Sequence, residues 1–281
     1  PVSPLAPTTY PELPEVAGVR FATAEAGIKY RNRTDVLLVA MEPGTVVAGV
    51  LTRSKCPSAA VDWCRERLAG GTARALLVNS GNANAFTGAV GQASVDAVTG
   101  AVAKAAGVPA SRVFSSSTGV IGEPLPHDRI VAKVEELAAA LDAGGIEAAA
   151  RAIMTTDTFP KGACAEVEGE GGVIRIAGIA KGSGMIAPNM ATMLVYLFTD
   201  AKIPQKTLQK MLSRQVDDTF NAITVDSDTS TSDALIIAAT GRSTAAPIGD
   251  LRSKVAKDFE AALRAVMMDL AHQVVKDGEG A

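Results

Sequence analysis

A segment rich in small residues leads directly into a short apolar run, and this junction constrains the fold more than any other part of the chain. The segment is Lys181-Gly-Ser-Gly-Met-Ile-Ala-Pro-Asn-Met-Ala-Thr192, followed at once by Met193-Leu-Val-Tyr-Leu-Phe198. A short apolar run with branched and aromatic residues predicts a buried strand. Thr192 therefore stands at the entrance to a buried strand, after glycines and alanines that permit close approach of the backbone.

This position would suit Thr192 to act as a nucleophile after a cut in the chain. A threonine hydroxyl is a weak nucleophile at neutral pH unless a base activates it. If the bond from Ala191 to Thr192 is broken, Thr192 gains a free α-amine with a pKa of about 7.7–8.0, close to what a general base needs. One residue would then supply both nucleophile and base. On the local pattern alone, an ordinary strand threonine is the more common interpretation.

Histidines and cysteines are too sparse to favour other common catalysts. The only two histidines are His127 and His272, and neither adjoins a nucleophile motif, which leaves a serine–histidine or cysteine–histidine mechanism without support. The three cysteines, Cys56, Cys64 and Cys164, contain no Cys-x-x-Cys pair. We therefore expect free buried thiols, with no disulfide framework and no zinc or other metal site.

Charge and hydropathy exclude several kinds of partner. The 27 basic and 30 acidic residues are scattered and give a net charge of −3, without a basic stripe for nucleic acid. Apolar runs fall well short of the roughly 18 residues that cross a bilayer. Residues 1–7 lack the basic and apolar regions of a signal peptide. We expect a cytoplasmic protein with no nucleic-acid or membrane partner.

Strand and helix signals alternate along the chain. Buried strands are predicted at residues 34–40, 45–52, 75–79, 113–117, 173–180, 193–199 and 232–240. Helices are predicted at residues 93–106, 128–141, 148–154, 204–217 and 251–275. No linker and no repeat interrupts this order. The pattern predicts one layered α/β domain over residues 1–281, with helices outside a mixed sheet or a pair of sheets.

Several segments also match a known family in the same order. Besides residues 181–192, they are Ala26-Gly-Ile-Lys29, Val78-Asn-Ser-Gly-Asn-Ala-Asn-Ala85, Ser116-Ser-Thr-Gly-Val-Ile-Gly122, Met154-Thr-Thr-Asp-Thr-Phe-Pro-Lys161 and Val275-Lys-Asp-Gly-Glu-Gly-Ala281. Over essentially the entire chain, the sequence resembles the ornithine acetyltransferase (glutamate N-acetyltransferase) family. The resemblance implies an α/β sandwich of the DmpA/ArgJ-like type, with mixed sheets and outer helices, distinct from the Rossmann fold. It also implies self-cleavage between Ala191 and Thr192 into an alpha chain, 1–191, and a beta chain that begins with residues 192–281.

The activity that the resemblance implies belongs to arginine biosynthesis. The acetyl group of N2-acetyl-L-ornithine would pass to L-glutamate through an acetyl-threonine intermediate, with ping-pong kinetics, releasing ornithine and N-acetylglutamate. No cofactor is expected, because the acyl-enzyme carries the group; some family members also accept acetyl-CoA as donor, and the sequence does not distinguish the two kinds. The self-cleaved alpha and beta chains are expected to form a heterotetramer of two alpha and two beta chains.

The resemblance assigns the oxyanion hole and the substrate contacts to particular residues. Thr118 and Gly119, expected in a turn after a short strand, would form the oxyanion hole that stabilises the tetrahedral intermediate. Substrate contacts are carried over to Thr155, Lys181, Thr192 and Glu279.

Lys181 is expected on a flexible loop near Thr192, where it would supply a cation for substrate carboxylates, and Glu279 would pair with the substrate's ammonium group. Taken locally, the Ser-Thr-Gly stretch is more often a simple turn, and a residue such as Glu279 is more often a solvated acidic residue. The segment 225–233 is rich in acids and hydroxyls, but it lacks the spacing of a calcium loop. We interpret it as turn and capping residues near the site.

Two other functions remain open at this stage. One is a self-processed amidohydrolase or aminopeptidase, in which water replaces glutamate as acceptor; the other is a non-catalytic binding relative. Family members also continue beyond the Asp-Gly-Glu-Gly segment, whereas this sequence stops at Ala281. We therefore expect either that the rest of the beta chain, with further substrate contacts, lies outside this sequence, or that the protein is not a complete enzyme.

Overall fold

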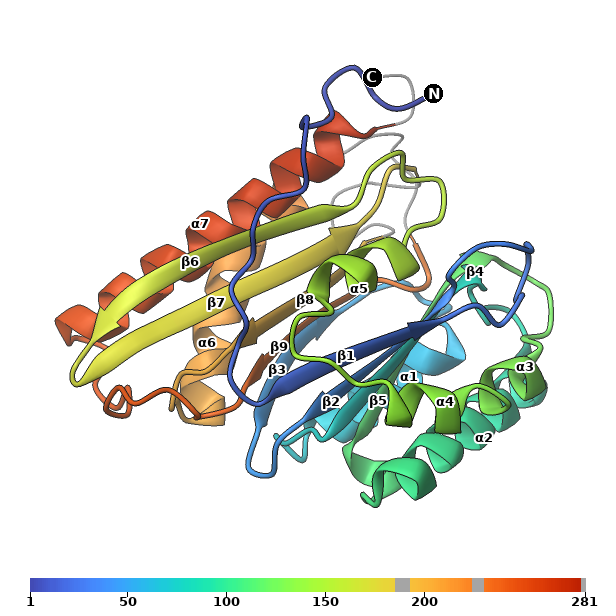
Figure 1. Ribbon diagram of the computed structural model, residues 1–281, viewed down its shortest axis with the longest axis horizontal. Helices are drawn as coiled ribbons and strands as arrows, with labels where there is room; N and C mark the ends of the chain where they lie inside the picture. The colour runs from blue at the N-terminus through green and yellow to red at the C-terminus, as the bar shows by residue number, and fades with distance from the viewer. Residues whose placement is uncertain (185–192, 224–229, 279–281) are drawn as a thin grey trace.

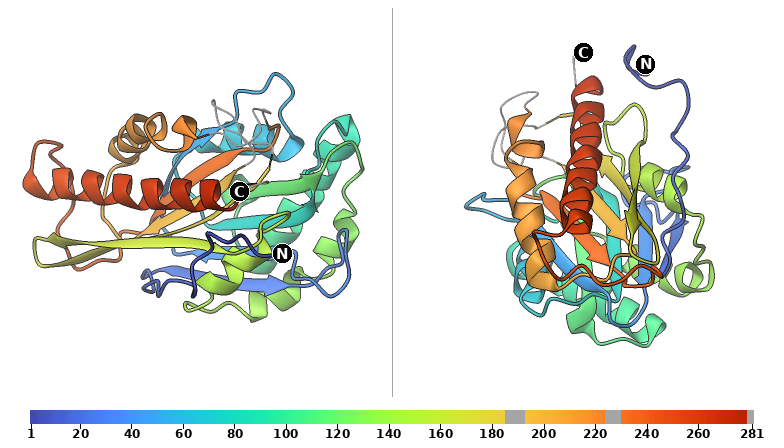
Figure 2. Two further views of the ribbon diagram at one scale, coloured as in Figure 1. Left: turned by 90° about the horizontal axis from the view of Figure 1, so that it is seen from above. Right: turned by 90° about the vertical axis from the view of Figure 1, so that its left-hand side faces the viewer.

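Two β-sheets lie face to face in the computed structural model, with helices on their outer faces (Figures 1 and 2). The structure describes residues 1–184, 193–223 and 230–278. The predicted layered α/β architecture, with mixed sheets and outer helices, is confirmed.

The first sheet has four strands in the order β1-β2-β4-β5. The strands are β1 (Val19–Ala24), β2 (Val36–Met41), β4 (Ala75–Asn82) and β5 (Val113–Val120). Strand β2 runs antiparallel to both of its neighbours, β1 and β4, whereas β5 runs parallel to β4. Helix α2 (Gly88–Ala106) and the short 3-10 turn η1 (Ala110–Arg112) provide the crossover that this parallel pair requires.

The second sheet has five strands in the order β3-β9-β8-β7-β6. They are β3 (Val46–Leu51), β9 (Ala234–Ala239), β8 (Leu194–Thr199), β7 (Gly172–Lys181) and β6 (Lys161–Gly169). The central pair β8-β9 is parallel, and the remaining pairs are antiparallel. The crossover between β8 and β9 contains helix α6 (Gln205–Val216) and the 3-10 turn η2 (Phe220–Ala222).

The helices divide between the two outer faces and the sides. Helices α6 and α7 (Lys254–Lys276) cover the five-stranded sheet, and α2, α3 (His127–Val131) and α4 (Val134–Ala139) cover the four-stranded sheet (Figure 1). Helix α1 (Ala59–Leu68) contacts both β3 and β5, and α5 (Ile146–Ala152) contacts both β1 and β7. These two helices therefore connect the sheets at their sides.

Strand β8 shows why its sequence is apolar throughout. Leu194, Tyr196 and Phe198 belong to the core between the sheets, and Val195 and Leu197 belong to the core under the outer helices. A strand covered on both faces loses the alternation of polar and apolar residues. Across the interface the rings of Phe21 and Phe198 meet edge to face, with centroids 5.3 Å apart.

The sequence did not predict β1, β6 or α1. Strands β1 and β6 are edge strands with partly exposed residues, so their sequences mix polar and apolar side chains. The continuous helix predicted at 128–141 is wrong, because α3 and α4 are separated at Ala132 and Lys133. All three cysteines are free, as expected, but only Cys64 is buried; Cys56 and Cys164 are exposed.

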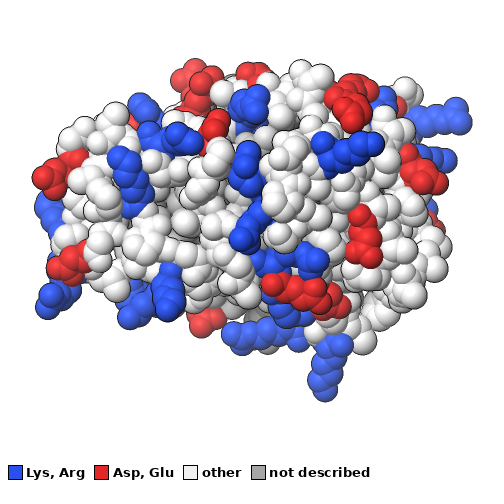
Figure 3. Space-filling model, turned by 90° about the horizontal axis from the view of Figure 1, so that it is seen from below, with Lys and Arg blue, Asp and Glu red and all other residues white. Residues whose placement is uncertain are grey.

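The surface carries charges of both signs. Figure 3 shows lysines and arginines spread among aspartates and glutamates over one face of the molecule. In the ranges that the structure describes, no helix has the length and apolar character needed to cross a membrane.

Removing the ring of Phe198 should test the core between the sheets. Phe198 is buried and packs on Phe21, so Phe198→Ala should lower the free energy of unfolding by about 3–5 kcal/mol. The exposed Phe86 offers a matched control, for which Phe86→Ala should change that free energy by less than about 0.5 kcal/mol. Chemical denaturation measures both; equal effects would show that the two sheets do not share this core.

Candidate active site

Three of the predicted site residues meet where β7 and β5 end. The ammonium group of Lys181 donates hydrogen bonds to Thr118 Oγ1 at 3.0 Å and to Thr155 Oγ1 at 2.7 Å. Lys181 belongs to the five-stranded sheet and Thr118 to the four-stranded sheet, while Thr155 follows α5. The contact therefore connects both sheets and a side helix at one end of the sandwich.

Lys181 does not lie on a flexible loop, contrary to the sequence-based expectation. It is the last residue of β7, paired with Leu194, and only 2% of it is exposed. Burial lowers the pKa of its ammonium group, although the carboxyl groups of Asp157 and Asp233 act in the opposite direction. Because its partners already hold the side chain in place, binding a ligand to this ammonium group would cost little side-chain conformational entropy.

Thr118 and Gly119 do not form a turn either; they continue β5. They pair with Ser80 and Gly81 of β4, just before an irregularity at Asn82. Gly119 has a φ of +130°, and a Cβ there would lie 2.4 Å from the carbonyl carbon of Gly81. Only glycine fits at this crossing of two backbones. The hydroxyl of Thr118 accepts a hydrogen bond from Lys181 and keeps its own proton for donation.

A buried ionic network that sequence analysis missed supports these residues. The ammonium group of Lys161 lies 2.8 Å from Asp157 Oδ1 and 2.6 Å from Asp277 Oδ2, and all three side chains are fully buried. It also donates to the carbonyl of Phe159 at 3.2 Å. Such a network is costly to break, because a remaining charge has no access to water.

Asp157 joins this network to the residues that meet at Lys181. Its Oδ1 accepts the N–H of Gly182 at 2.7 Å, and its Oδ2 accepts the N–H of Thr155 at 3.1 Å. Burial acts to raise the pKa of Asp157, but the nearby Lys181 and Lys161, with the hydrogen bonds, lower it below the usual aspartate value. The carboxylate stays charged and holds two parts of the site in place.

Asp277 brings the end of α7 to the same region. Its carboxylate accepts the backbone N–H of Thr158 at 2.8 Å and also the hydroxyl of Thr158. Glu279 follows two residues later but lies outside the described residues, as do Ala191 and Thr192. Their predicted roles remain predictions.

The backbone N–H of Met193 contacts Asp233, a residue that the sequence analysis did not single out. The N–H of Met193 donates to Asp233 Oδ1 at 2.8 Å, where the parallel strands β8 and β9 begin. Asp233 lies within the acidic, hydroxyl-rich segment that we interpreted as turn and capping residues. It lies between Ser232 and Ala234, and nothing in the local pattern marked its side chain as fully buried.

The missed residues carry only a weak sequence signal. Asp157 and Lys161 occur within the segment Met154-Thr-Thr-Asp-Thr-Phe-Pro-Lys161, four positions apart, and Asp277 occurs some hundred residues later. Charged residues beside apolar strands are a sign of paired burial, but their pairing over that separation depends on the fold. The described ranges contain no group of three or more histidine, cysteine, aspartate or glutamate side chains arranged to hold a metal ion.

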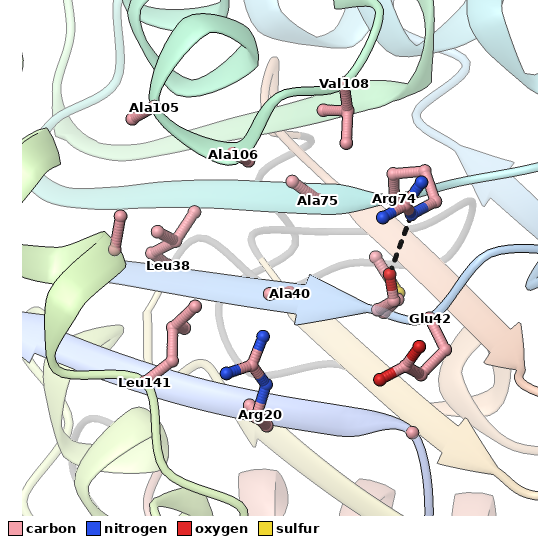
Figure 4. Close-up of a pocket in the computed structure, with 13 residues that line it drawn as sticks. Arg20, Leu38, Ala40, Glu42, Arg74, Ala75, Ala105, Ala106, Val108 and Leu141 are labelled. Atoms are coloured by element: carbon pink, nitrogen blue, oxygen red, sulfur yellow. Dashed lines mark hydrogen bonds between the residues drawn. The ribbon is translucent and has the colours of Figure 1, made fainter.

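A separate pocket lies away from these residues. It has a volume of about 250 Å³ on the four-stranded sheet beside α2 and α4, with Arg20, Glu42 and Arg74 among its lining residues (Figure 4). Arg74 donates from Nε to the carbonyl of Met41 at 3.0 Å. None of the predicted site residues lines this pocket.

Removing the charge of Lys161 should expose the cost of the buried network. Lys161→Met leaves Asp157 and Asp277 without their shared cation, and it should lower the free energy of unfolding by about 3–5 kcal/mol near pH 7. The matched control is Lys133→Met, which breaks a partly exposed pair with Glu136 and should cost less than about 1 kcal/mol.

The difference between wild type and Lys161→Met should also depend on pH. The lowered pKa of Asp157 stabilises the folded protein above the ordinary aspartate range of about 3.9, and this stabilisation is lost as the pH falls through the folded-state value. The difference in unfolding free energy should therefore shrink under acid conditions. A difference that stays constant from neutral to acid pH would contradict the charged network.

Comparisons with known proteins agree with the resemblance found in the sequence. The profile of the ArgJ family matches residues 20–281. The arginine biosynthesis bifunctional protein ArgJ of Ruegeria pomeroyi is 60% identical, over 100% of this chain and 68% of the relative. The protein of the same name from Bradyrhizobium diazoefficiens is 55% identical, with the same coverage of both chains.

Solved structures give the same result for the fold. Ornithine acetyltransferase from Mycobacterium tuberculosis, solved in complex with ornithine, is 38% identical with a TM-score of 0.56, covering 62% of this chain and 92% of that one. The L-aminopeptidase D-Ala-esterase/amidase of Ochrobactrum anthropi, described as a variant of the Ntn hydrolase fold, has a TM-score of 0.55 at 12% identity, covering 97% of this chain and 89% of that one. The second likeness concerns the fold alone, and neither neighbour is of the Rossmann type. By its matched profile and by relatives at this level of identity, the chain belongs to the ArgJ family.

Proposed function

We propose that this protein transfers the acetyl group of N2-acetyl-L-ornithine to L-glutamate, with Thr192 as the nucleophile after self-cleavage before that residue. Relatives named for arginine biosynthesis, and a solved neighbour that binds ornithine, support this substrate class. The observation that carries the proposal is the contact of buried Lys181 with Thr118 and Thr155.

The connection between β7 and β8 supports the choice of Thr192. Lys181 ends β7 and is paired with Leu194 of β8, so both ends of the segment between them lie side by side. Thr192 stands two residues before Leu194 in the sequence. Its attachment to β8 thus ties the proposed nucleophile to the strand that neighbours Lys181.

The proposed cycle has two similar halves. The hydroxyl of Thr192 attacks the acetyl carbonyl carbon, its proton passes to the α-amine of the same residue, and the amine of ornithine leaves with that proton. The amine of glutamate then attacks the acetyl-threonine, and the threonine hydroxyl is restored. Each half forms a tetrahedral oxyanion, for which the Thr118 hydroxyl is the proposed donor together with the backbone N–H of Gly119.

Lys181 is suited to two tasks in this scheme. Because its ammonium group donates to the oxygen of Thr118, it polarises that hydroxyl and makes it a stronger donor. An ammonium group has three donors, and the structure shows two of them used by described residues. The third suits a substrate carboxylate. Glu279 remains our proposed partner for the substrate's ammonium group, and Thr155 a proposed substrate contact.

The length of a solved relative supports self-cleavage at this point. The match to the M. tuberculosis structure covers 62% of this chain but 92% of the solved chain, which is therefore about two thirds as long. The piece 1–191 makes up about two thirds of the present sequence as well. We propose that residues 1–191 and the piece beginning at Thr192 form the alpha and beta chains, assembled as a heterotetramer in the cytoplasm. We propose no cofactor and treat acetyl-CoA as a possible second donor to be tested.

Substituting Thr192 tests the whole proposal. Intact-mass spectrometry of the denatured full-length protein should show two pieces, one ending at Ala191 and one beginning with Thr192. Thr192→Ala should give a single uncut chain without acetyl transfer, because nucleophile and base are lost together. Acetyl transfer by that uncut variant would sink the mechanism. Equal loss of acetylornithine with and without glutamate would instead assign the protein as an amidohydrolase.

Substituting Thr118 tests the oxyanion hole. Thr118→Val keeps the shape but removes the hydroxyl, so kcat should fall by about 100-fold or more while KM changes far less. Thr99 of α2 provides a control, because Thr99→Val also removes a buried hydroxyl, one bonded to the carbonyl of Val95. A similar loss of kcat in both variants would mean that Thr118 acts through stability.

A further inference from the structure

Asp233 is a buried carboxyl group for which the proposed acetyl transfer has no use. None of its surface is exposed, and its Oδ1 accepts the N–H of Met193 at 2.8 Å. Its backbone carbonyl accepts the N–H of Thr52 at 3.1 Å, just beyond β3. Three neighbouring strands, β3, β9 and β8, therefore fix its position.

The second carboxyl oxygen has a different environment. Oδ2 of Asp233 has no hydrogen-bond partner within the described part of the chain. A buried polar atom without a partner lowers stability, so its presence in a native fold calls for a reason. Burial raises the pKa of Asp233 well above the usual value, although the Met193 N–H, the Ser230 hydroxyl and the charge of Lys181 act to lower it.

Covalent geometry connects this carboxyl group to Thr192. The nitrogen of Met193, which Asp233 holds, is bonded to the carbonyl carbon of Thr192. The hydroxyl oxygen of Thr192 is four bonds from that nitrogen, at most about 6 Å. The carboxyl group is thus held at Met193, the residue that directly follows the proposed nucleophile in the sequence.

Self-cleavage poses a problem that acetyl transfer does not. Before the cut, the nitrogen of Thr192 belongs to an amide, which cannot serve as a base, so another group must accept the hydroxyl proton. We propose that Asp233 is the general base of self-cleavage. This inference rests on the proposed function, because it presupposes that Thr192 is the nucleophile.

Every proton and bond in the proposed self-cleavage step is accounted for. The carboxylate of Asp233 takes the proton from Thr192 Oγ1 as the bond from that oxygen to the Ala191 carbonyl carbon forms. The carboxyl group then returns the proton to the Thr192 nitrogen as the carbon–nitrogen bond breaks, leaving an ester. Water hydrolyses the ester, which frees the Ala191 carboxyl group, the threonine hydroxyl and the α-amine. The amine then serves as base in every later turnover.

The variant Asp233→Asn isolates the proton transfer. Asparagine keeps an oxygen for the N–H of Met193 and loses only the ability to accept a proton, so the first-order rate of cleavage should fall by about 100-fold or more. Freshly translated full-length protein, quenched at intervals and weighed by mass spectrometry, gives this rate.

Asp200→Asn is the matched control. Asp200 is also buried, also has a raised pKa, and accepts the N–H of Arg175 at 2.8 Å through Oδ1. It follows the far end of β8, so its variant should cleave at the wild-type rate. Equal rates for wild type and Asp233→Asn would overturn the inference.

Two further readouts separate chemistry from structure. The wild-type cleavage rate should fall with decreasing pH through an apparent pKa that lies above the ordinary aspartate range, and Asp233→Asn should lose this dependence. A wild-type rate that stays constant as the pH falls, or a pH dependence that Asp233→Asn retains, would overturn the assignment; the latter would point to another group such as Lys181, whose charge acts on Asp233. Once cut, Asp233→Asn should lose a much smaller factor in the kcat of acetyl transfer than in the rate of cleavage. Equal losses in cleavage and transfer would also count against the inference.

The result distinguishes this inference from the proposed function. A wild-type protein that never cleaves removes both. A wild-type protein that cleaves and transfers acetyl groups, beside an Asp233→Asn variant that cleaves equally fast, removes only the role of Asp233.

Discussion

The site depends on one buried carboxylate, that of Asp157. It accepts the backbone N–H of Gly182, directly after Lys181, and the backbone N–H of Thr155. It can stay ionised in a buried position because Lys161 and Lys181 surround it with positive charge. Lys161 in turn needs Asp277, which ties down the end of α7. Two lysines, Lys161 and Lys181, and two aspartates, Asp157 and Asp277, thus balance their charges within one buried cluster. This cluster determines the positions of Lys181 and Thr155.

This arrangement also offsets part of the cost of burying a lysine at the end of a strand. An isolated ammonium group in such a position would tend to lose its proton. Lys181 has two hydroxyl groups as direct acceptors and two carboxyl groups nearby. Because its partners come from both sheets, their packing and the geometry of the site cannot change independently. Mutations in the core between the sheets should therefore disturb this contact as well.

Much of the architecture could be predicted from the sequence, and so could the gathering of Lys181, Thr118 and Thr155. The buried central strands have long apolar runs, and family motifs marked the three residues. The conformations around them were not predicted correctly. Thr118 and Gly119 read as a turn because Ser-Thr-Gly is a common turn sequence, but pairing with β4 keeps them in a strand. Lys181 read as a loop residue because a charge normally ends a buried strand.

The ionic network and Asp233 could not be predicted, for a related reason. Lys161 and Asp277 are separated by 116 positions, and their contact exists only after β6 and α7 pack together. Asp233 stands in a run of acids and hydroxyls in which every member looks alike. The burial of Asp233 follows from its place directly before β9, which pairs with β8. Sequence patterns report local preference, whereas these charges are selected by tertiary packing.

The strand order of the five-stranded sheet has a consequence for a chain cut before Thr192. Strands β8 and β9 would belong to the second piece, yet they lie between β7 and β3, which both belong to the first. The second piece would supply two strands in the middle of the sheet. Backbone hydrogen bonds would join β9 to β3 and β8 to β7, both strands of the first piece. Neither piece could leave without opening two strand edges at once, and each alone would expose those edges. Such a protein would hold together without a covalent link, but once unfolded its pieces would have to find each other again by collision.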